Sequence, residues 1–233
     1  MSDRIAKIIA RAGVCSRRDA EKLIFEGRVK LDNVLVTTPA VKLEDSHGIT
    51  IDGRPISNTA NTRLWLYHKP RGCITSHKDE LDRETVFSRL PKDMPRVISV
   101  GRLDYNTEGL LLLTNDGEFA RKMELPSSEI VRRYLVRIYG KINAKELEQL
   151  KNGITIKNVN YKPMELNIRT DKAFNNWVDV AISEGKNREI RKIFEHFDLQ
   201  VTRLIRTSYG DYSLGDLKVN QVREVNIEDF PKN

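Results

Sequence analysis

The sequence predicts an α+β protein of two domains, a small helix-rich domain over residues 1–60 and a larger domain over residues 61–233. The prediction rests on a change of pattern along the chain: apolar residues first recur at helical spacing, and short strand-like runs predominate later. Between the two patterns lies the polar stretch 57–63, SNTANTR, which has no periodicity and is typical of a linker. A chain of 233 residues is long enough for two small domains.

The first domain is expected to contain two helices and a small sheet. Apolar residues at helical spacing predict a helix over residues 4–12, which Gly13 ends. Ser16, with Asp19 three residues later, is typical of a capping box and predicts a second helix that ends at Gly27. Alternating apolar residues then predict short strands at residues 29–31, 34–36 and 49–51.

The second domain is expected to be rich in strands. Four consecutive leucines, Leu110 to Leu113, lie between turn signals, a pattern typical of a strand that is buried on both faces. Further strands are predicted at residues 64–67, 96–100, 134–138, 163–169, 177–182 and 201–206, and helices at residues 119–123, 144–150 and 187–197.

The charge composition predicts a basic protein. Lys and Arg number 40 and Asp and Glu number 33, which gives a formal net charge of +7. Residues 1–30 alone hold eight Lys and Arg against four Asp and Glu. An excess of positive charge at one end of the chain favours a nucleic-acid partner, although a basic surface alone does not specify one.

Several classes of protein are excluded by the motifs that the sequence lacks. No apolar run approaches the ~20 residues of a membrane helix, and the amino terminus does not resemble a signal peptide, so we expect a cytoplasmic protein without a membrane partner. Cys15 and Cys73 lie far apart, and the four histidines have no zinc-ligand spacing, so no metal site is expected. Glycine-rich nucleotide loops and Ser or Cys nucleophile motifs are missing, so no cofactor is expected.

The loop 101–109, GRLDYNTEG, holds a single aspartate between two apolar strands. Burial beside such strands would disfavour the ionised carboxylate of Asp104 unless a cation or several hydrogen-bond donors compensate. A functional role for this carboxylate would therefore need a cation, such as an arginine from another part of the chain. The alternative is a surface loop in which Asp104 only stabilises its own turn.

Residues 184–192, EGKNREIRK, form a dense cluster of cations at the predicted start of a helix. Asn187 can cap this helix. Arg188, Arg191 and Lys192 then share one face of it. Backbone N–H groups and the positive end of the helix dipole add to these side chains, so the segment favours phosphate contacts. The alternative is a solvated, charged helix.

The strand 131–137, VRRYLVR, places an aromatic residue among three arginines. The ring of Tyr134 is suited to stacking on an unstacked base, with cations near the RNA backbone. The alternative is a tyrosine of the core beside exposed arginines.

The segment 101–117, GRLDYNTEGLLLLTNDG, resembles the catalytic motif of bacterial pseudouridine synthases of the RsuA/RluB type. The segments 69–72 (KPRG) and 184–191 (EGKNREIR) resemble the motifs that flank it in this family, and Tyr134 lies between them in the same order. The similarity extends over residues 4–225.

Residues 4–56 resemble the small RNA-binding module named after ribosomal protein S-four. The resemblance implies an S-four type RNA-binding domain with its linker over residues 1–60. It also implies a pseudouridine synthase catalytic domain over residues 61–233, with a mixed, mainly antiparallel central sheet flanked by helices.

The resemblance further implies an activity, the isomerisation of uridine to pseudouridine in ribosomal RNA. The loop Asp-Tyr-Asn-Thr and the ending Thr-Asn-Asp-Gly favour the large-subunit branch of the family. Because the reaction exchanges a nitrogen–carbon for a carbon–carbon glycosidic bond, it is redox-neutral and needs neither cofactor nor metal. Ribosomal RNA is then the partner of a monomeric enzyme. The alternative is a non-catalytic S-four-domain protein that binds RNA or assists ribosome assembly.

Individual roles follow from the resemblance. Asp104 matches the essential aspartate, Arg191 the basic residue that pairs with it, and Tyr134 the aromatic residue that stacks on the target base. Arg102 matches an arginine that holds the nucleotide out of its helix, and Leu204 an apolar residue of the pocket floor. The residues implied to bind RNA or substrate are Arg102, Thr107, Lys186, Arg188 and Leu204 in the second domain, and Arg17, Arg18 and Lys22 in the first.

Overall fold

The chain forms two compact units. The computed structural model describes residues 2–57, 61–77, 79, 81–170 and 174–227. The first unit comprises residues 1–63, 92–98 and 114–119, and the second comprises residues 64–91, 99–113 and 120–233. Two short segments from the later part of the sequence therefore belong to the first unit.

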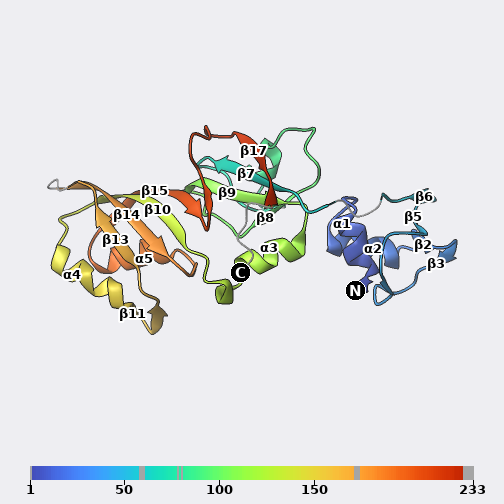
Figure 1. Cartoon of the computed structure of the whole chain (residues 1–233), viewed down its shortest axis with the longest axis horizontal. Helices are drawn as coiled ribbons and strands as arrows, with labels where there is room; N and C mark the ends of the chain where they lie inside the picture. Colours follow the sequence, from blue (N-terminus) through green and yellow to red (C-terminus); the bar gives the residue numbers. More distant parts are fainter. Residues whose placement is uncertain (1, 58–60, 78, 80, 171–173, 228–233) are drawn as a thin grey trace. The chain divides into compact units, whose positions relative to one another are not determined.

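The first unit contains two helices (Figure 1), and their apolar residues supply most of its core. Helix α1 (Ile5–Arg11) follows the predicted periodicity, and α2 (Arg17–Phe25) begins directly after Ser16. The Ser16 hydroxyl oxygen accepts a hydrogen bond from the Asp19 N–H at 3.1 Å, so the predicted cap is confirmed. The buried apolar residues of the two helices are Ile5, Ala6, Ile8, Ile9, Ala20 and Ile24.

A small antiparallel sheet completes this core in the described part of the first unit. Its strands are β2 (Val29–Leu31), β3 (Val34–Leu35), β5 (Ile49–Ile51) and β6 (Arg54–Pro55), in the order β3-β2-β5-β6. Asp32 and Asn33 form the turn between β2 and β3 with φ of 47° and 66°, which Asp and Asn tolerate well. The two-residue strands β1 (Asp3–Arg4) and β4 (Lys42–Leu43) pair separately and are too short for periodicity to predict.

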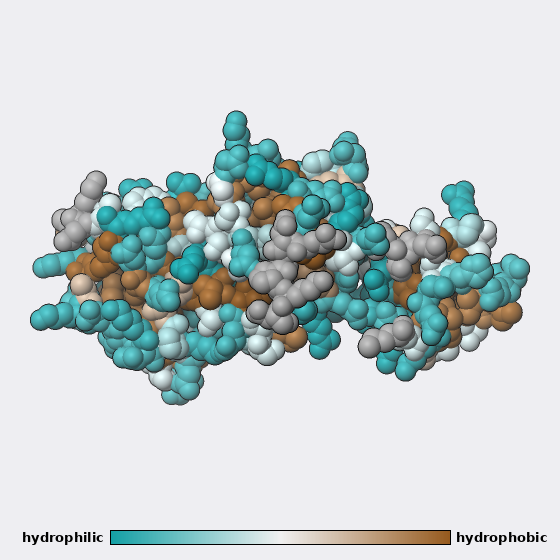
Figure 2. Space-filling model, viewed as in Figure 1, coloured by the Kyte–Doolittle hydropathy of each residue, from teal (hydrophilic) through white to brown (hydrophobic). Residues whose placement is uncertain are grey.

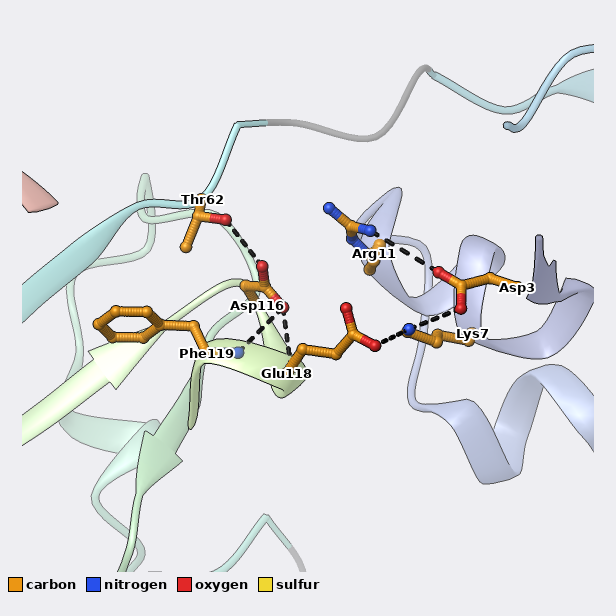
Figure 3. A network of polar contacts seen from close by, with 7 residues as sticks. All are labelled: Asp3, Lys7, Arg11, Thr62, Asp116, Glu118 and Phe119. Atoms are coloured by element: carbon orange, nitrogen blue, oxygen red, sulfur yellow. Dashed lines mark hydrogen bonds and ion pairs between the residues drawn. The ribbon is translucent and has the colours of Figure 1, made fainter. Parts of the chain in front are cut away.

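A polar network in the first unit connects the beginning of the chain to the segment around Asp116 (Figure 3). Lys7 forms ion pairs with Asp3, at 2.7 Å, and with Glu118. Asp116 accepts hydrogen bonds from the Thr62 hydroxyl at 2.7 Å and from the Glu118 N–H at 2.8 Å. Asp116 thereby caps the helix that begins at Gly117. The sequence pattern predicted this helix from its apolar residues and did not predict the cap.

A mixed sheet forms the centre of the second unit (Figure 1). Its described strands are β7 (Leu64–Lys69), β8 (Ile98–Val100), β9 (Glu108–Thr114), β10 (Arg132–Tyr139), β13 (Glu165–Ile168), β14 (Asn175–Ile182), β15 (Gln200–Tyr209), β16 (Tyr212–Ser213) and β17 (Val222–Val225). The order is β13-β14-β10-β15-β9-β7-β17, with β16 beside β15 and β8 beside β9. β15 and β9 are parallel, whereas β10 pairs antiparallel with both β14 and β15. The expected mixed, mainly antiparallel sheet is therefore confirmed.

Strand β9 is buried along its whole length, as the leucine run predicts. It begins at Glu108, earlier than predicted, because Glu108 and Gly109 pair with Ile205 and Arg206 of β15. A Cβ atom on Gly109 would lie 2.3 Å from the backbone oxygen of Arg206, so only glycine permits this approach. The pairing brings the loop before β9 next to β15.

Helices flank the sheet, as expected. In the second unit they are α4 (Ala144–Glu148), α5 (Glu189–His196) and the later part of α3 (Gly117–Glu124), whose first turn belongs to the first unit. Helix α5 packs against β15. The predicted helix near residue 150 ends in a 3-10 turn over Gln149–Asn152. Asn187 does not cap α5: Arg188 occupies that position without a side-chain cap. The helix therefore begins two residues later than predicted.

Three strand pairs in the described part of the second unit were not predicted, and one of them is the pairing of β16 with β15. β11 (Ile154–Ile156) and β12 (Val159–Tyr161) form a separate hairpin. β17 completes one edge of the large sheet by pairing with β7, so that Val225 lies opposite Leu64. These partners come from opposite ends of the domain, and local periodicity carries no information about such a pairing.

The surface of both units is rich in polar side chains. Figure 2 shows hydrophilic residues over much of the visible face, with apolar residues between them. In the part of the chain that the structure describes, no helix has the length and apolar character needed to cross a membrane.

Candidate active site

A cavity of about 1070 Å³ lies in the second unit. Its wall combines the loop before β9, parts of β10 and β15, and the segment that leads from β14 into α5. These segments are distant in the sequence, but the sheet places β15 between β9 and β10 and so brings them together. The predicted site residues that line the cavity are Arg102, Asp104, Thr107, Tyr134, Lys186, Arg188, Arg191 and Leu204.

Asp104 occupies a turn immediately before β9. The Thr107 N–H donates to the backbone oxygen of Asp104 at 3.0 Å and closes this turn. The Asp104 side chain lines the cavity and is 36% exposed, so the carboxylate is half-buried rather than enclosed as the flanking strands suggested. A half-buried carboxylate keeps part of its hydration and needs less compensation from cations.

The cation that pairs with this carboxylate is Arg188. Its Nη1 lies 3.7 Å from Oδ2 of Asp104, the one ion pair that Asp104 forms among the described residues. Arg188 has φ of 53° and ψ of 33°, the left-handed conformation, which costs a non-glycine residue about 1 kcal/mol. Strain of this kind persists only where surrounding contacts enforce it.

Arg191 has different partners from those expected. It donates to the backbone oxygens of Val201 at 3.0 Å and Asn106 at 3.1 Å. Burial lowers the pKa of Arg191, the charge of Arg188 acts in the same direction, and the charge of Asp104 opposes both. The ion pair expected between Arg191 and Asp104 is thus replaced by an ion pair between Arg188 and Asp104. Arg191 lies one helical turn further along the chain, and its N–H groups donate to backbone oxygens instead.

Lys69, from the segment KPRG, forms hydrogen bonds to the backbone of the turn that contains Asp104. Its side chain is completely buried, and Nζ donates to the backbone oxygens of Pro70 at 3.0 Å, Asp104 at 3.1 Å and Thr107 at 2.9 Å. Burial lowers the pKa of Lys69, while the negative charges of Asp104 and Glu108 oppose that shift. The sequence indicated only a turn here, since no local pattern shows which oxygens a lysine reaches.

Tyr134 and Leu204 contribute an aromatic and an apolar wall. Their exposed fractions are 8% and 5%, and both line the cavity. Val136 lies opposite Leu204 in the ladder of β10 and β15, which places Leu204 two residues along β10 from Tyr134. A flat ring beside an aliphatic side chain is suited to holding a planar base.

Two buried arginines were not predicted as site residues. Arg132 and Arg206 both line the cavity, and their guanidinium carbons lie 4.8 and 5.0 Å from the centre of the Tyr209 ring. Arg132 donates to the Tyr209 hydroxyl at 3.0 Å, and Arg206 donates to the backbone oxygen of Leu110 at 2.7 Å. Neither has a carboxylate partner among the described residues. This part of the cavity is therefore strongly positive.

The remaining predicted residues have varied surroundings. Arg102 is exposed at the cavity, whereas Thr107 is buried and its hydroxyl has no partner in the described ranges. Lys186 pairs with Glu184. Arg17, Arg18 and Lys22 are exposed on α2 of the first unit, where Arg17 lies 3.6 Å from Glu21.

The cavity is lined by more cations than carboxylates. Its cations are Arg83, Arg102, Arg132, Lys186, Arg188, Arg191 and Arg206, and its carboxylates are Asp79, Asp104, Glu124, Glu184 and Glu189. The described residues contain no group of three or more His, Cys, Asp or Glu that is suited to a metal ion. A basic cavity with a half-buried aspartate, an aromatic wall and an apolar wall is typical of an enzyme that acts on an anionic substrate with a planar base.

Comparison with known proteins identifies the family. Residues 63–196 match the RNA pseudouridylate synthase family, and residues 3–49 match the S4 domain. The chain therefore belongs to the RNA pseudouridylate synthases, which are isomerases, with an S4 domain preceding the catalytic domain.

Relatives support this assignment over nearly the whole chain. A protein of Rickettsia bellii, described as an uncharacterized RNA pseudouridine synthase, is 50% identical over 95% of this chain and 96% of its own length. Ribosomal large subunit pseudouridine synthase B of Salmonella typhi is 40% identical over 92% of this chain and 76% of its own length. A crystal structure of a pseudouridylate synthase matches with a TM-score of 0.68 and 26% identity, covering 96% of each chain.

Proposed function

We propose that the protein converts a uridine of large-subunit ribosomal RNA into pseudouridine, with Asp104 as the reacting carboxylate. The observation that carries this proposal is the Asp104 side chain, which meets a cavity of about 1070 Å³ beside Tyr134 and Leu204. The large-subunit substrate rests on relatives of about 40% identity that are named ribosomal large subunit pseudouridine synthase B.

The cavity has the properties that the isomerisation requires. A base cannot turn about its sugar while it is stacked in a helix, so the nucleotide must be extruded, and stacking on Tyr134 compensates for the lost contacts. The detached uracil must be retained until its carbon bonds to the sugar, which calls for an enclosing wall. Arg188 stabilises the Asp104 carboxylate, and Arg191 connects α5 to the loop through Asn106. We propose that the enzyme acts as a monomer, because these groups lie within one unit of the chain.

RNA contacts are proposed to extend beyond the cavity. Arg102, Thr107 and Lys186 line it together with the buried arginines, and Arg102 and Lys186 are proposed to bind the phosphates of the local nucleotide. The S4 domain, within residues 1–60, is proposed to dock a second RNA element through α2, and residues 61–233 to carry the chemistry. A ribosomal RNA substrate implies activity in the bacterial cytoplasm.

The proposed function is tested by incubating the purified protein with ribosomal RNA from a bacterial strain that lacks the corresponding gene. New pseudouridine at a defined uridine of the large-subunit RNA is expected. Modification confined to small-subunit RNA would contradict the substrate, and its complete absence from free RNA and ribosomal particles would contradict the activity. The non-catalytic alternative is not favoured, because the family match covers the catalytic domain.

Replacing Tyr134 by phenylalanine is expected to separate binding from chemistry. The ring stays and RNA affinity is retained, but the hydroxyl is lost, and turnover falls by about 100-fold if that hydroxyl transfers a proton. Single-turnover rates and filter-binding affinities measure the two effects. Tyr139→Phe, on the same strand but exposed, is the matched control and should leave both unchanged. A normal rate in Tyr134→Phe would exclude the hydroxyl from the reaction.

Neutralising the basic side chains of α2 is expected to weaken RNA binding without slowing the chemical step. The triple change of Arg17, Arg18 and Lys22 to glutamine should raise Kd about tenfold and reduce its salt dependence, because fewer counterions are released. The rate at saturating RNA should remain unchanged. A second triple variant, with glutamine at the exposed positions Lys30, Lys42 and Arg54, removes the same charge elsewhere in the unit. Equal losses in both variants would argue against a specific docking face on α2.

A further inference from the structure

The segment between β14 and α5 carries the cation that meets the Asp104 carboxylate. Arg188 approaches Asp104 to 3.7 Å from the left-handed backbone conformation, at the start of α5. No side chain caps the helix at this position. The contacts that hold Arg188 in place must therefore come from its neighbours in the segment.

Glu189 provides the first of these contacts. Its Oε2 accepts a hydrogen bond from the Lys186 N–H at 2.8 Å, and its own N–H donates to the Lys186 backbone oxygen at 3.1 Å. The two bonds close a ring that contains Arg188. The Glu189 side chain is only 3% exposed, and its Oε1 is buried without a hydrogen-bond partner in the described part of the chain.

Glu184 and Lys186 attach this ring to the rest of the unit. Glu184 is 9% exposed, accepts a hydrogen bond from the Lys162 N–H at 2.8 Å, and pairs with the Lys186 ammonium group. The same ammonium group lies 5.6 Å from the centre of the Tyr161 ring. The turn is thus fixed at both of its ends, on the strand side by Glu184 and on the helix side by Glu189.

We propose that Glu189 is a positioning residue for the reaction: its carboxyl oxygen closes the 186–189 turn and thereby directs the Arg188 guanidinium to Asp104. This inference rests on the proposed function. Glu189 lines the same cavity, but its hydrogen bond goes to the protein backbone, so it acts through Arg188 and not on the RNA.

The role requires a hydrogen-bond acceptor and not a charge. Burial raises the pKa of Glu189 to about 7, the negative charge of Glu184 acts in the same direction, and the Lys186 N–H opposes it. A neutral carboxyl group still accepts the Lys186 N–H through its carbonyl oxygen. Glutamine retains such an oxygen at the same distance from the backbone, whereas methionine keeps the length and lacks a strong acceptor.

The experiment compares Glu189→Met with Glu189→Gln in pseudouridine formation on ribosomal RNA. Glu189→Met is expected to lower kcat by about tenfold or more, because Arg188 is no longer held in position. KM should change by less than about threefold, and Glu189→Gln should keep at least about half of the wild-type kcat. Glu195→Ala, at an exposed position of the same helix, should have wild-type kinetics. If Glu189→Met is unfolded at the assay temperature, Glu189→Ala replaces it.

A double-mutant cycle tests whether Glu189 acts through Arg188. In an Arg188→Ala background, Glu189→Met should lower kcat by less than about twofold, because the group that Glu189 positions is already absent. Additive losses, equal kcat losses in the Met and Gln variants, or an unchanged kcat in Glu189→Met would each overturn the positioning role. The proposed function is judged separately, by wild-type activity and its loss in Asp104→Asn.

Discussion

Asp104→Asn is expected to abolish pseudouridine formation while the protein stays folded and binds ribosomal RNA. The substitution keeps the size of the side chain and removes the charge, so the group can neither attack the base or the sugar nor take a proton from the sugar. The rate should fall by at least about 1000-fold, the scale of losses when a reacting group is removed. The turn itself should persist, because its hydrogen bonds use backbone atoms of Asp104 and Thr107.

The measurement is single-turnover pseudouridine formation with the enzyme in excess, together with RNA affinity by filter binding. Asp211→Asn is the matched control: Asp211 is an exposed aspartate between β15 and β16, and its replacement should leave the rate unchanged. Turnover in Asp104→Asn within about tenfold of wild type would show that Asp104 is not the reacting carboxylate. Loss of RNA binding together with activity would instead indicate that the charge serves the fold of the site.

Lys69→Met is expected to reduce both stability and activity. The lysine donates to three backbone oxygens inside the protein, and methionine leaves these oxygens without that donor. At about 1 kcal/mol for each buried group left unsatisfied, the free energy of unfolding should fall by about 3 kcal/mol. The Asp104 turn loses its support, and a displacement of about 1 Å in a reacting group lowers the rate by about 100-fold.

Denaturant unfolding and single-turnover kinetics below the unfolding transition distinguish the two effects. Lys218→Met, at an exposed lysine of the same unit, should change the free energy of unfolding by less than about 0.5 kcal/mol. If Lys69→Met has wild-type stability but low activity, the lysine positions the Asp104 turn without stabilising the fold. Wild-type values for both quantities would show that the three oxygens find other donors.

Local sequence patterns determined much of the architecture. The periodicity of α1, the Ser16 cap of α2 and the leucine run of β9 each depend on neighbouring residues, whose spacing alone decides the outcome. The order of motifs likewise identified Asp104 and Tyr134 as residues that meet in one cavity. That result came from the family resemblance and not from periodicity.

The partners of charged side chains were decided only by the tertiary structure. Arg188 and Arg191 lie on one predicted helix face, but they have different partners. Helix α5 begins at Glu189, and Arg188, just before it, pairs with Asp104, whereas Arg191 donates hydrogen bonds to backbone oxygens. The burial of Arg132 and Arg206 around Tyr209 was equally invisible in the sequence. A side chain's neighbours depend on which distant segments the sheet order brings together.

The sequence by itself thus determined the presence of two folded parts and the positions of most helices and strands, and its family motif led to the proposal that Asp104 is the reacting carboxylate. The tertiary structure decided the contacts of Asp104: Lys69 donates a hydrogen bond to its backbone oxygen, and Arg188 forms an ion pair with its carboxylate. The physical reason is the sequence distance over which each effect acts. Helix propensity and capping depend on residues a few positions apart, whereas the contacts of Asp104 with Lys69 and Arg188 join segments that are distant in the sequence.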